Sequence, residues 1–496
     1  MKNNKIIIKT LIEEFIYKYL EKEEYEIHKI SSKKLLTWNR LDLAFKLFYL
    51  NNKKINPKLA LEVYREDIKA QTLGEFTEYG NELLKNNFDT YIKSFSNTLN
   101  NIQENGFDKK KTLIPLSSDQ SLINGSHRVS SAIYLEKEVY CITTEADKLV
   151  ADYQYFFKRD VSNELLEIVV QEFIKYSADN IYIAFLWPSG KENKDRSEKE
   201  FSNIVYKKEI KLNAKGAFNL LFELYKHMDW IGNEKNGFQG INQKLIECFP
   251  SFNKFTVLIF QEDNLEQVQI IKKNVRKIHN IGFSSIHITD YKEEAIRISN
   301  LLLNKNGLHF LNFANPLKYK MIYNELNIFN SFLNKNKINK NEVLIDGSVI
   351  LTLYGLRNNE DIDYLLLEHK EIKLQDIRFE NHDSELKYHK INKNELITNQ
   401  KYYFQYMGFK FISFEQLFYM KQNRAEEKDI NDCNMMKSLI ENNKFQIIKS
   451  KINQKILYFK IKSKAYILSS LIKILKKIGL YIIIRRIYRT IKGTEV

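Results

Sequence analysis

Two short apolar runs joined through a Gly-Ser pair constrain the fold of this chain more than any other feature. The first run, Val343–Asp346, has the composition of a buried strand and leads directly into Gly347 and Ser348. The second begins beside Asp361 and Asp363, and carboxylates at positions i and i+2 of a strand point to the same face. Such a pair suits a divalent cation, because Mg²⁺ is usually held by one or two carboxylates together with substrate phosphates. A glycine turn leaves backbone N–H groups free to receive phosphate, so the segment predicts a site for a metal–nucleotide complex.

This segment resembles the polymerase-β-like nucleotidyltransferase superfamily, whose pattern is Gly, then Gly or Ser, about ten residues, and Asp-hydrophobic-Asp. Here twelve residues separate Ser348 from Asp361. The resemblance covers residues 320–440 and implies a Mg²⁺- or Mn²⁺-dependent enzyme that uses ATP or another NTP. It implies that Asp361 and Asp363 are catalytic and hold the metal, and that Gly347 and Ser348 bind the nucleotide. It further implies a third carboxylate on a later strand, for which the candidates are Glu380, Asp376 and Asp383.

Downstream of this pattern, Phe409–Ile412 predicts a strand that ends at Ser413, the N-cap of a helix. One continuous helix is expected to carry Lys421, Arg424, Lys428, Asp429 and Asp432. Positions 421, 424, 428 and 432 share one face of it, because they step by three or four residues. Small nucleotidyltransferases carry a similar helix beside the site, where Lys421 and Arg424 would neutralise triphosphate charge. The alternatives are that these side chains form ion pairs within the protein, and that the acidic pair upstream is only a solvated surface turn.

A second motif, in the N-terminal part of the chain, places cations at the start of a predicted helix. Gly125 permits a tight turn, and Ser126 is expected to cap the helix. His127 and Arg128 then fall in the first turn, where positive charge opposes the helix dipole. A bound phosphate would supply the missing negative charge.

Residues 123–128, Ile-Asn-Gly-Ser-His-Arg, resemble the core of the ParB/sulfiredoxin-like superfamily. The resemblance implies such a domain, behind a helical N-terminus, over residues 1–155. It implies nucleotide or phosphate binding by Asn124, Gly125, Ser126, His127 and Arg128. Asparagine stands where an aspartate is common and the arginine-rich box of ParB is missing, so no DNA partner is expected. The alternative is a structural His-Arg pair that holds a loop.

Residues 160–315 predict a separate α/β unit, with a charged surface loop over 190–200. The order of its elements resembles that of nucleoside diphosphate kinases, and the resemblance implies a ferredoxin-like fold. His287 falls at the nucleophile position of that family and Arg276 at its late arginine, although Trp187 replaces an expected lysine. The resemblance implies that His287 binds phosphate or is phosphorylated. The alternative is a scaffold without phosphotransfer.

The net charge of +15 is concentrated at the C-terminal end of the chain. Residues 445–496 contain thirteen Lys or Arg and one acid, so the rest carries only +3 and predicts no extensive nucleic-acid contacts. Basic residues interrupt the apolar runs of this tail, which stay far below the roughly 20 residues of a membrane span. The pattern predicts basic amphipathic helices over 441–496 that lie on an anionic membrane surface. The alternatives are packing on the protein's own domains and nucleic-acid binding.

Together these patterns predict an α/β and α+β multidomain protein with units at 1–155, 160–315 and 320–440, followed by the tail. The leading hypothesis is a nucleotidyltransferase that moves NMP from NTP to a sugar, a lipid-linked saccharide or another small acceptor, as in surface polysaccharide biosynthesis. The alternatives are an ATP-dependent small-molecule kinase that uses the N-terminal domain and a nucleotide-binding scaffold without turnover. Three scattered cysteines and an N-terminus without a signal-peptide pattern predict a cytoplasmic location, at the inner face of the membrane through the tail.

Overall fold

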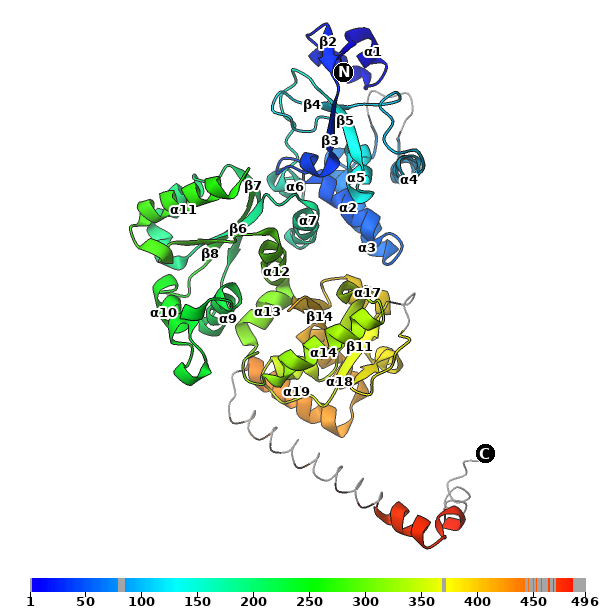
Figure 1. The fold of residues 1–496 in the computed structure, drawn as a ribbon, viewed down its shortest axis with the longest axis vertical. Helices are drawn as coiled ribbons and strands as arrows, with labels where there is room; N and C mark the ends of the chain where they lie inside the picture. The colour runs from blue at the N-terminus through cyan, green and yellow to red at the C-terminus, as the bar shows by residue number, and fades with distance from the viewer. Residues whose placement is uncertain are drawn as a thin grey trace.

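The computed structural model describes residues 2–78, 85–367 and 372–441, together with 470–484 and isolated positions between 445 and 467. The described chain is a mixed α/β protein whose strands gather into four sheets (Figure 1). The smallest sheet pairs two strands near the N-terminus, β1 (Lys2–Asn4) and β2 (Glu24–Glu26), with α1 (Lys5–Lys9) between them.

The second sheet lies in the N-terminal part of the chain and has the order β3-β5-β4. β5 is central, antiparallel to β3 and parallel to β4. α2 is buried along most of its length because it packs against both α3 and α5. The elements are β3 (His28–Ser31), α2 (Asp42–Asn52), α3 (Pro57–Gln71), α4 (Phe88–Asn105), β4 (Ile114–Leu116), α5 (Ser126–Tyr134) and β5 (Glu138–Thr143).

The third sheet lies in the middle of the chain, has the order β7-β8-β6-β9, and is antiparallel at every neighbouring pair. β6 and β8 are buried at every residue, as expected for strands that helices cover. The strands are β6 (Ile181–Leu186), β7 (Asn203–Ile210), β8 (Phe255–Gln261) and β9 (Ile286–Ile288). The helices are α6 (Tyr153–Phe157), α7 (Asn163–Tyr176), α8 (Lys194–Glu198), α9 (Ala214–Tyr225), α10 (Gln239–Cys248), α11 (Leu265–His279), α12 (Lys292–Leu302) and α13 (Lys305–Phe313).

The fourth sheet positions the candidate site and has the order β12-β11-β10-β14-β13. It is mixed, because β10 runs antiparallel to β11 but parallel to β14, and β11 runs parallel to β12. The strands are β10 (Val343–Asp346), β11 (Ile362–Leu366), β12 (Phe379–Asn381), β13 (Tyr403–Tyr406) and β14 (Phe409–Ile412). The helices are α14 (Met321–Lys335), α15 (Val349–Leu353), α16 (Leu386–His389), α17 (Lys393–Thr398), α18 (Phe414–Arg424) and α19 (Glu427–Ile440).

One hydrophobic cluster extends from Leu35 to Met436 and takes in residues of the second, third and fourth sheets. The three sheets therefore share a continuous apolar interior, and the mixed α/β character expected from the sequence is confirmed. The named family resemblances and the domain boundaries stay predictions. No helix in the described part of the chain has the length and apolar character needed to cross a bilayer.

Three local expectations differ from the structure. Residues 190–200, expected as a surface loop, contain a 3₁₀ helix (Pro188–Asn193) and α8. The N-cap of α5 is Gly125, in a left-handed conformation at φ 93°, and Ser126 is already helical. The helix that carries Lys421 ends at Arg424, because Ala425 adopts φ 55° and the chain turns back as α19.

Candidate functional site

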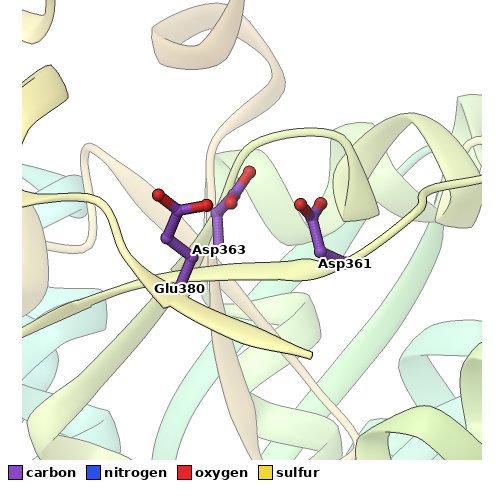
Figure 2. Close-up of side chains that lie close together, drawn as sticks. All are labelled: Asp361, Asp363 and Glu380. Atoms are coloured by element: carbon purple, nitrogen blue, oxygen red, sulfur yellow. The ribbon is translucent and has the colours of Figure 1, made fainter. Parts of the chain in front are cut away.

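Three carboxylates meet at one edge of the fourth sheet. Ligand oxygens of Asp361, Asp363 and Glu380 all lie within 4.8 Å of one another. Figure 2 shows the three side chains projecting to the same side of β11 and β12. Of the three candidates for the third carboxylate, Glu380 is therefore the one that joins the aspartate pair.

Strand geometry explains this convergence. Ile362 and Tyr364 are buried, so the alternation of β11 turns Asp361 and Asp363 together to the opposite face. β12 runs parallel to β11 with Glu380 directly in register with Asp363. The expectation from the sequence that the two aspartates share a face is confirmed.

The turn at Gly347 fits closely against the acidic cluster. Gly347 has φ 70°, a conformation that side chains rarely adopt, and it follows Asp346, which is in register with Asp363. A Cβ atom at Gly347 would lie 2.0 Å from Asp363 Oδ2. The carboxylate therefore occupies the space that only a glycine leaves, beside a backbone turn that continues into Ser348. Within the described chain, the Ser348 side chain makes no capping hydrogen bond to α15.

A buried aspartate, Asp346, directly precedes this turn. Asp346 is fully buried, and its Oδ2 accepts hydrogen bonds from His382 Nδ1 at 2.8 Å and His389 Nε2 at 2.9 Å. His382 follows β12 directly, and its backbone N–H donates to Tyr364 O at 2.9 Å. The Asp346 side chain thus connects the end of β10 to the segment that begins just after Glu380.

The electrostatics of the cluster favour a bound cation. Among the described residues, none of the three carboxylates forms an ion pair with a lysine or arginine. Burial, together with the charges of Asp361, Asp346 and Glu380, raises the pKa of Asp363 to about 7 against the opposing effect of His382. Oxygen ligands of this kind suit hard ions such as Mg²⁺ and Mn²⁺.

Both histidines lower the pKa of Asp346. Burial alone would raise the pKa of that aspartate, but the charge of His389 and hydrogen bonds from both imidazoles hold it well below its usual value. Burial alone would lower the pKa of His382, but its hydrogen bond to Asp346 and the charge of that aspartate raise the pKa above its usual value. Asp346 therefore stays charged beside the cluster, with Oδ2 held by the two histidines and with its buried Oδ1 lacking a hydrogen-bond partner among the described residues.

The cations expected beside the triphosphate are engaged in ion pairs. Lys421 Nζ lies 3.0 Å from Asp429 Oδ1 and 2.8 Å from Asp432 Oδ2, and it is almost fully buried. Arg424 pairs with Asp429 at 2.8 Å and with Glu385 at 3.1 Å. These contacts join α18 to α19, which agrees with the ion-pair alternative, and nucleotide binding by the two residues stays a prediction.

The N-terminal motif lies beside a cavity of about 750 Å³, which Asn124, Gly125, Ser126, His127 and Arg128 help to line. Arg128 pairs with Glu13 at 2.6 Å, so a carboxylate supplies the negative charge that the first turn of α5 calls for. His127 Nε2 lies 2.8 Å from the Tyr64 hydroxyl, and burial holds its pKa well below the usual value. His127 is therefore neutral, and phosphate binding by this motif stays a prediction.

The middle-domain residues are mostly enclosed. His287 is in β9, its Nδ1 lies 3.1 Å from the Tyr225 hydroxyl, and its buried Nε2 has no hydrogen-bond partner in the described chain. Burial lowers its pKa to about 3. Arg276 stacks over Phe283 with its Cζ 4.5 Å from the ring centre. The imidazole is neutral and its Nε2 is buried, and a nucleophilic role for His287 stays a prediction.

Sequence reasoning missed the Asp346, His382 and His389 group. The position of Asp346, directly before the glycine turn, was a usable signal, because a carboxylate at the end of a buried strand needs partners. The two histidines carried no such signal, since neither has a spacing that links it to β10.

Comparison with models of protein families gives no match, and neither do comparisons with curated proteins and with solved structures. The chemistry of the site is therefore inferred from its own side chains.

Proposed function

We propose that this chain is a divalent-metal-dependent nucleotidyltransferase that transfers NMP from an NTP to a small acceptor. The observation that carries the proposal is the placement of Asp361, Asp363 and Glu380 against the Gly347 turn. Three converging carboxylates that pair with no lysine or arginine of the described chain explain where a metal would sit. A backbone turn in contact with one of them explains where phosphate oxygens would sit.

The three carboxylates would hold Mg²⁺ or Mn²⁺, and the backbone at Gly347 and Ser348 would receive the triphosphate. A bound cation supplies charge stabilisation at the phosphate oxygens and alignment of the attacking group. The acceptor oxygen forms a bond to the α-phosphorus while the bond from that phosphorus to the bridging oxygen breaks. Pyrophosphate leaves, and the proton of the acceptor hydroxyl passes to a carboxylate of the cluster. We further propose that the acceptor is a sugar or a lipid-linked saccharide of surface polysaccharide synthesis.

The test is transfer of label from each α-³²P-labelled NTP, with Mg²⁺ and a lysate of the source cells as acceptor pool. The variant is Asp361→Asn/Asp363→Asn, and the matched control is Asp376→Asn/Asp383→Asn. The control removes two carboxylates of the same unit that lie outside the cluster and pair with Arg378 and Lys393. Transfer by the wild type and the control, lost in the variant, is expected. Equal transfer by all three proteins refutes the assignment, and Mn²⁺ titration of each protein gives a readout independent of the acceptor.

The alternative is an ATP-dependent small-molecule kinase with its site in the N-terminal cavity. The observation that favours it is the volume of that cavity and its lining by residues 124–128. Movement of γ-label instead of α-label, abolished by His127→Ala but not by Asp361→Asn, is the result that would establish it. Binding of nucleotide without movement of either label would favour a scaffold.

A further inference from the structure

The described end of the chain forms a short amphipathic helix. Residues 470–477 are helical, and residues 481–484 are helical again after a break. At about 100° per residue, Leu471, Ile474 and Ile478 share one face. Three lysines, at 473, 476 and 477, occupy the opposite face. Apolar and basic side chains are thus separated around the axis.

The helix ends at a defined cap. Gly479 has φ 74°, its N–H donates to Lys476 O at 3.3 Å, and Leu480 N–H donates to Leu475 O at 3.0 Å. This pair of bonds is the Schellman motif, in which a left-handed glycine ends a helix and apolar residues follow. The cap separates the helix from a second apolar run, Leu480 and Ile482 to Ile484.

The apolar face has no partner in the described structure. Leu471, Ile474 and Ile478 are 50%, 56% and 57% exposed, and Ile482 is 77% exposed. None of the hydrophobic clusters of the described residues includes a residue from 470–484. Figure 1 places this segment apart from the sheets, beyond α19. Packing against the described domains therefore does not account for these side chains.

We propose that residues 470–484 dock on the surface of an anionic lipid bilayer, with the apolar face inserted and the lysines at the level of the lipid phosphates. Charge complementarity supports this partner, because residues 445–496 carry thirteen basic residues and one acid. A nucleic acid would match the lysines but would leave the isoleucine and leucine face exposed to water. A second copy of the chain would cover the apolar face but would bring two strongly basic tails together. The proposal is independent of the proposed function.

The test uses the full chain and sedimentation with vesicles of phosphatidylcholine containing 30% phosphatidylglycerol, against vesicles of phosphatidylcholine alone. The first variant, Leu471→Ser/Ile474→Ser/Ile478→Ser, removes the apolar face. The second, Lys473→Gln/Lys476→Gln/Lys477→Gln, removes the charge. The matched control, Ile246→Ser/Ile270→Ser/Ile281→Ser, alters three exposed isoleucines of the middle unit, at 68%, 45% and 43% exposure.

We expect the wild type and the control to bind the anionic vesicles, with loss of binding in the first variant. The second variant should bind roughly 100-fold more weakly, since each basic residue near an anionic surface contributes about a fivefold factor. Equal binding to both kinds of vesicle, or unchanged binding by the first variant, would overturn the proposal. Two other results would also overturn the proposal. One is self-association of the wild type without lipid that the first variant abolishes, and the other is RNA binding by the wild type that anionic vesicles do not displace. Thermal unfolding of each variant, expected to match the wild type because the altered residues are exposed, excludes misfolding as the cause.

Discussion

Substitution of Gly347 by alanine should separate the geometry of the acidic cluster from the stability of the fold. The added Cβ would lie 2.0 Å from Asp363 Oδ2, whereas real Cβ contacts essentially never fall below 3.0 Å. The carboxylate must therefore move by about 1 Å, and a displacement of this size costs on the order of 100-fold in rate. We expect Mn²⁺ affinity to fall by roughly 10- to 100-fold, the range seen when the support of a ligand is disturbed.

The matched control is Gly408→Ala. Gly408 has a similar φ of 77°, but its nearest neighbours, atoms of the Lys340 side chain, are 3.8 Å from the position that a Cβ atom would take. Both substitutions should lower the free energy of unfolding by about 1–2 kcal/mol through left-handed strain, as measured by urea denaturation. Only Gly347→Ala should lose Mn²⁺ binding, measured by electron paramagnetic resonance, together with nucleotidyl transfer. Equal Mn²⁺ affinity in the two alanine variants would refute the reasoning. So would a free energy of unfolding that is much lower in Gly347→Ala than in Gly408→Ala and stays so when Asp363 is also replaced by alanine.

Three further predictions concern buried charge. Because the pKa of Asp363 is about 7, a proton competes with the cation, and the apparent dissociation constant for Mn²⁺ should fall about tenfold from pH 6 to pH 8; a flat titration series would contradict this. Asp346→Asn should lower the free energy of unfolding by roughly 3 kcal/mol, because it removes one partner from a buried charged group. Asp361→Asn relieves repulsion among the three carboxylates and should not lower the free energy of unfolding. Urea denaturation compares the two variants. Burial lowers the pKa of Lys410 to about 7, so the folded state binds fewer protons than the unfolded state above that pH. Stability relative to Lys410→Met should therefore rise by roughly 2 kcal/mol from pH 7 to pH 9 in chemical denaturation, and a constant difference would show that the lysine stays charged.

The sequence was sufficient for the local parts of the site. Apolar runs predicted β10, β11 and β14 because buried strands need continuous hydrophobic residues, and the alternation of β11 predicted the shared face of Asp361 and Asp363. The sequence did not show which of the three later carboxylates, Glu380, Asp376 or Asp383, joins the aspartate pair. Glu380 joins the cluster only because β12 pairs with β11 in one register, and strand register across a connection is a tertiary property.

Tertiary contacts also explain the helix break at Ala425, which alanine's high helix propensity argues against. Asp429 pairs with both Lys421 and Arg424, and these contacts require α19 to fold back across α18. The sequence predicted one continuous helix for these residues, because i,i+4 spacing cannot distinguish one helix from two helices that pack together.

Glu380 lies on the outermost strand of its sheet, a strand of three residues whose one partner in the described structure is β11. Asp361 and Asp363, in contrast, belong to or adjoin a strand that is flanked on both sides. Terminal strands of this kind open locally at a lower free energy than the sheet interior. Glu380 can thus leave the cluster while the fold persists, so under the proposed function metal binding is lost at a lower temperature than the fold. Inactivation by mild heating would then be fast and reversible, and it would precede any change in the bulk secondary structure.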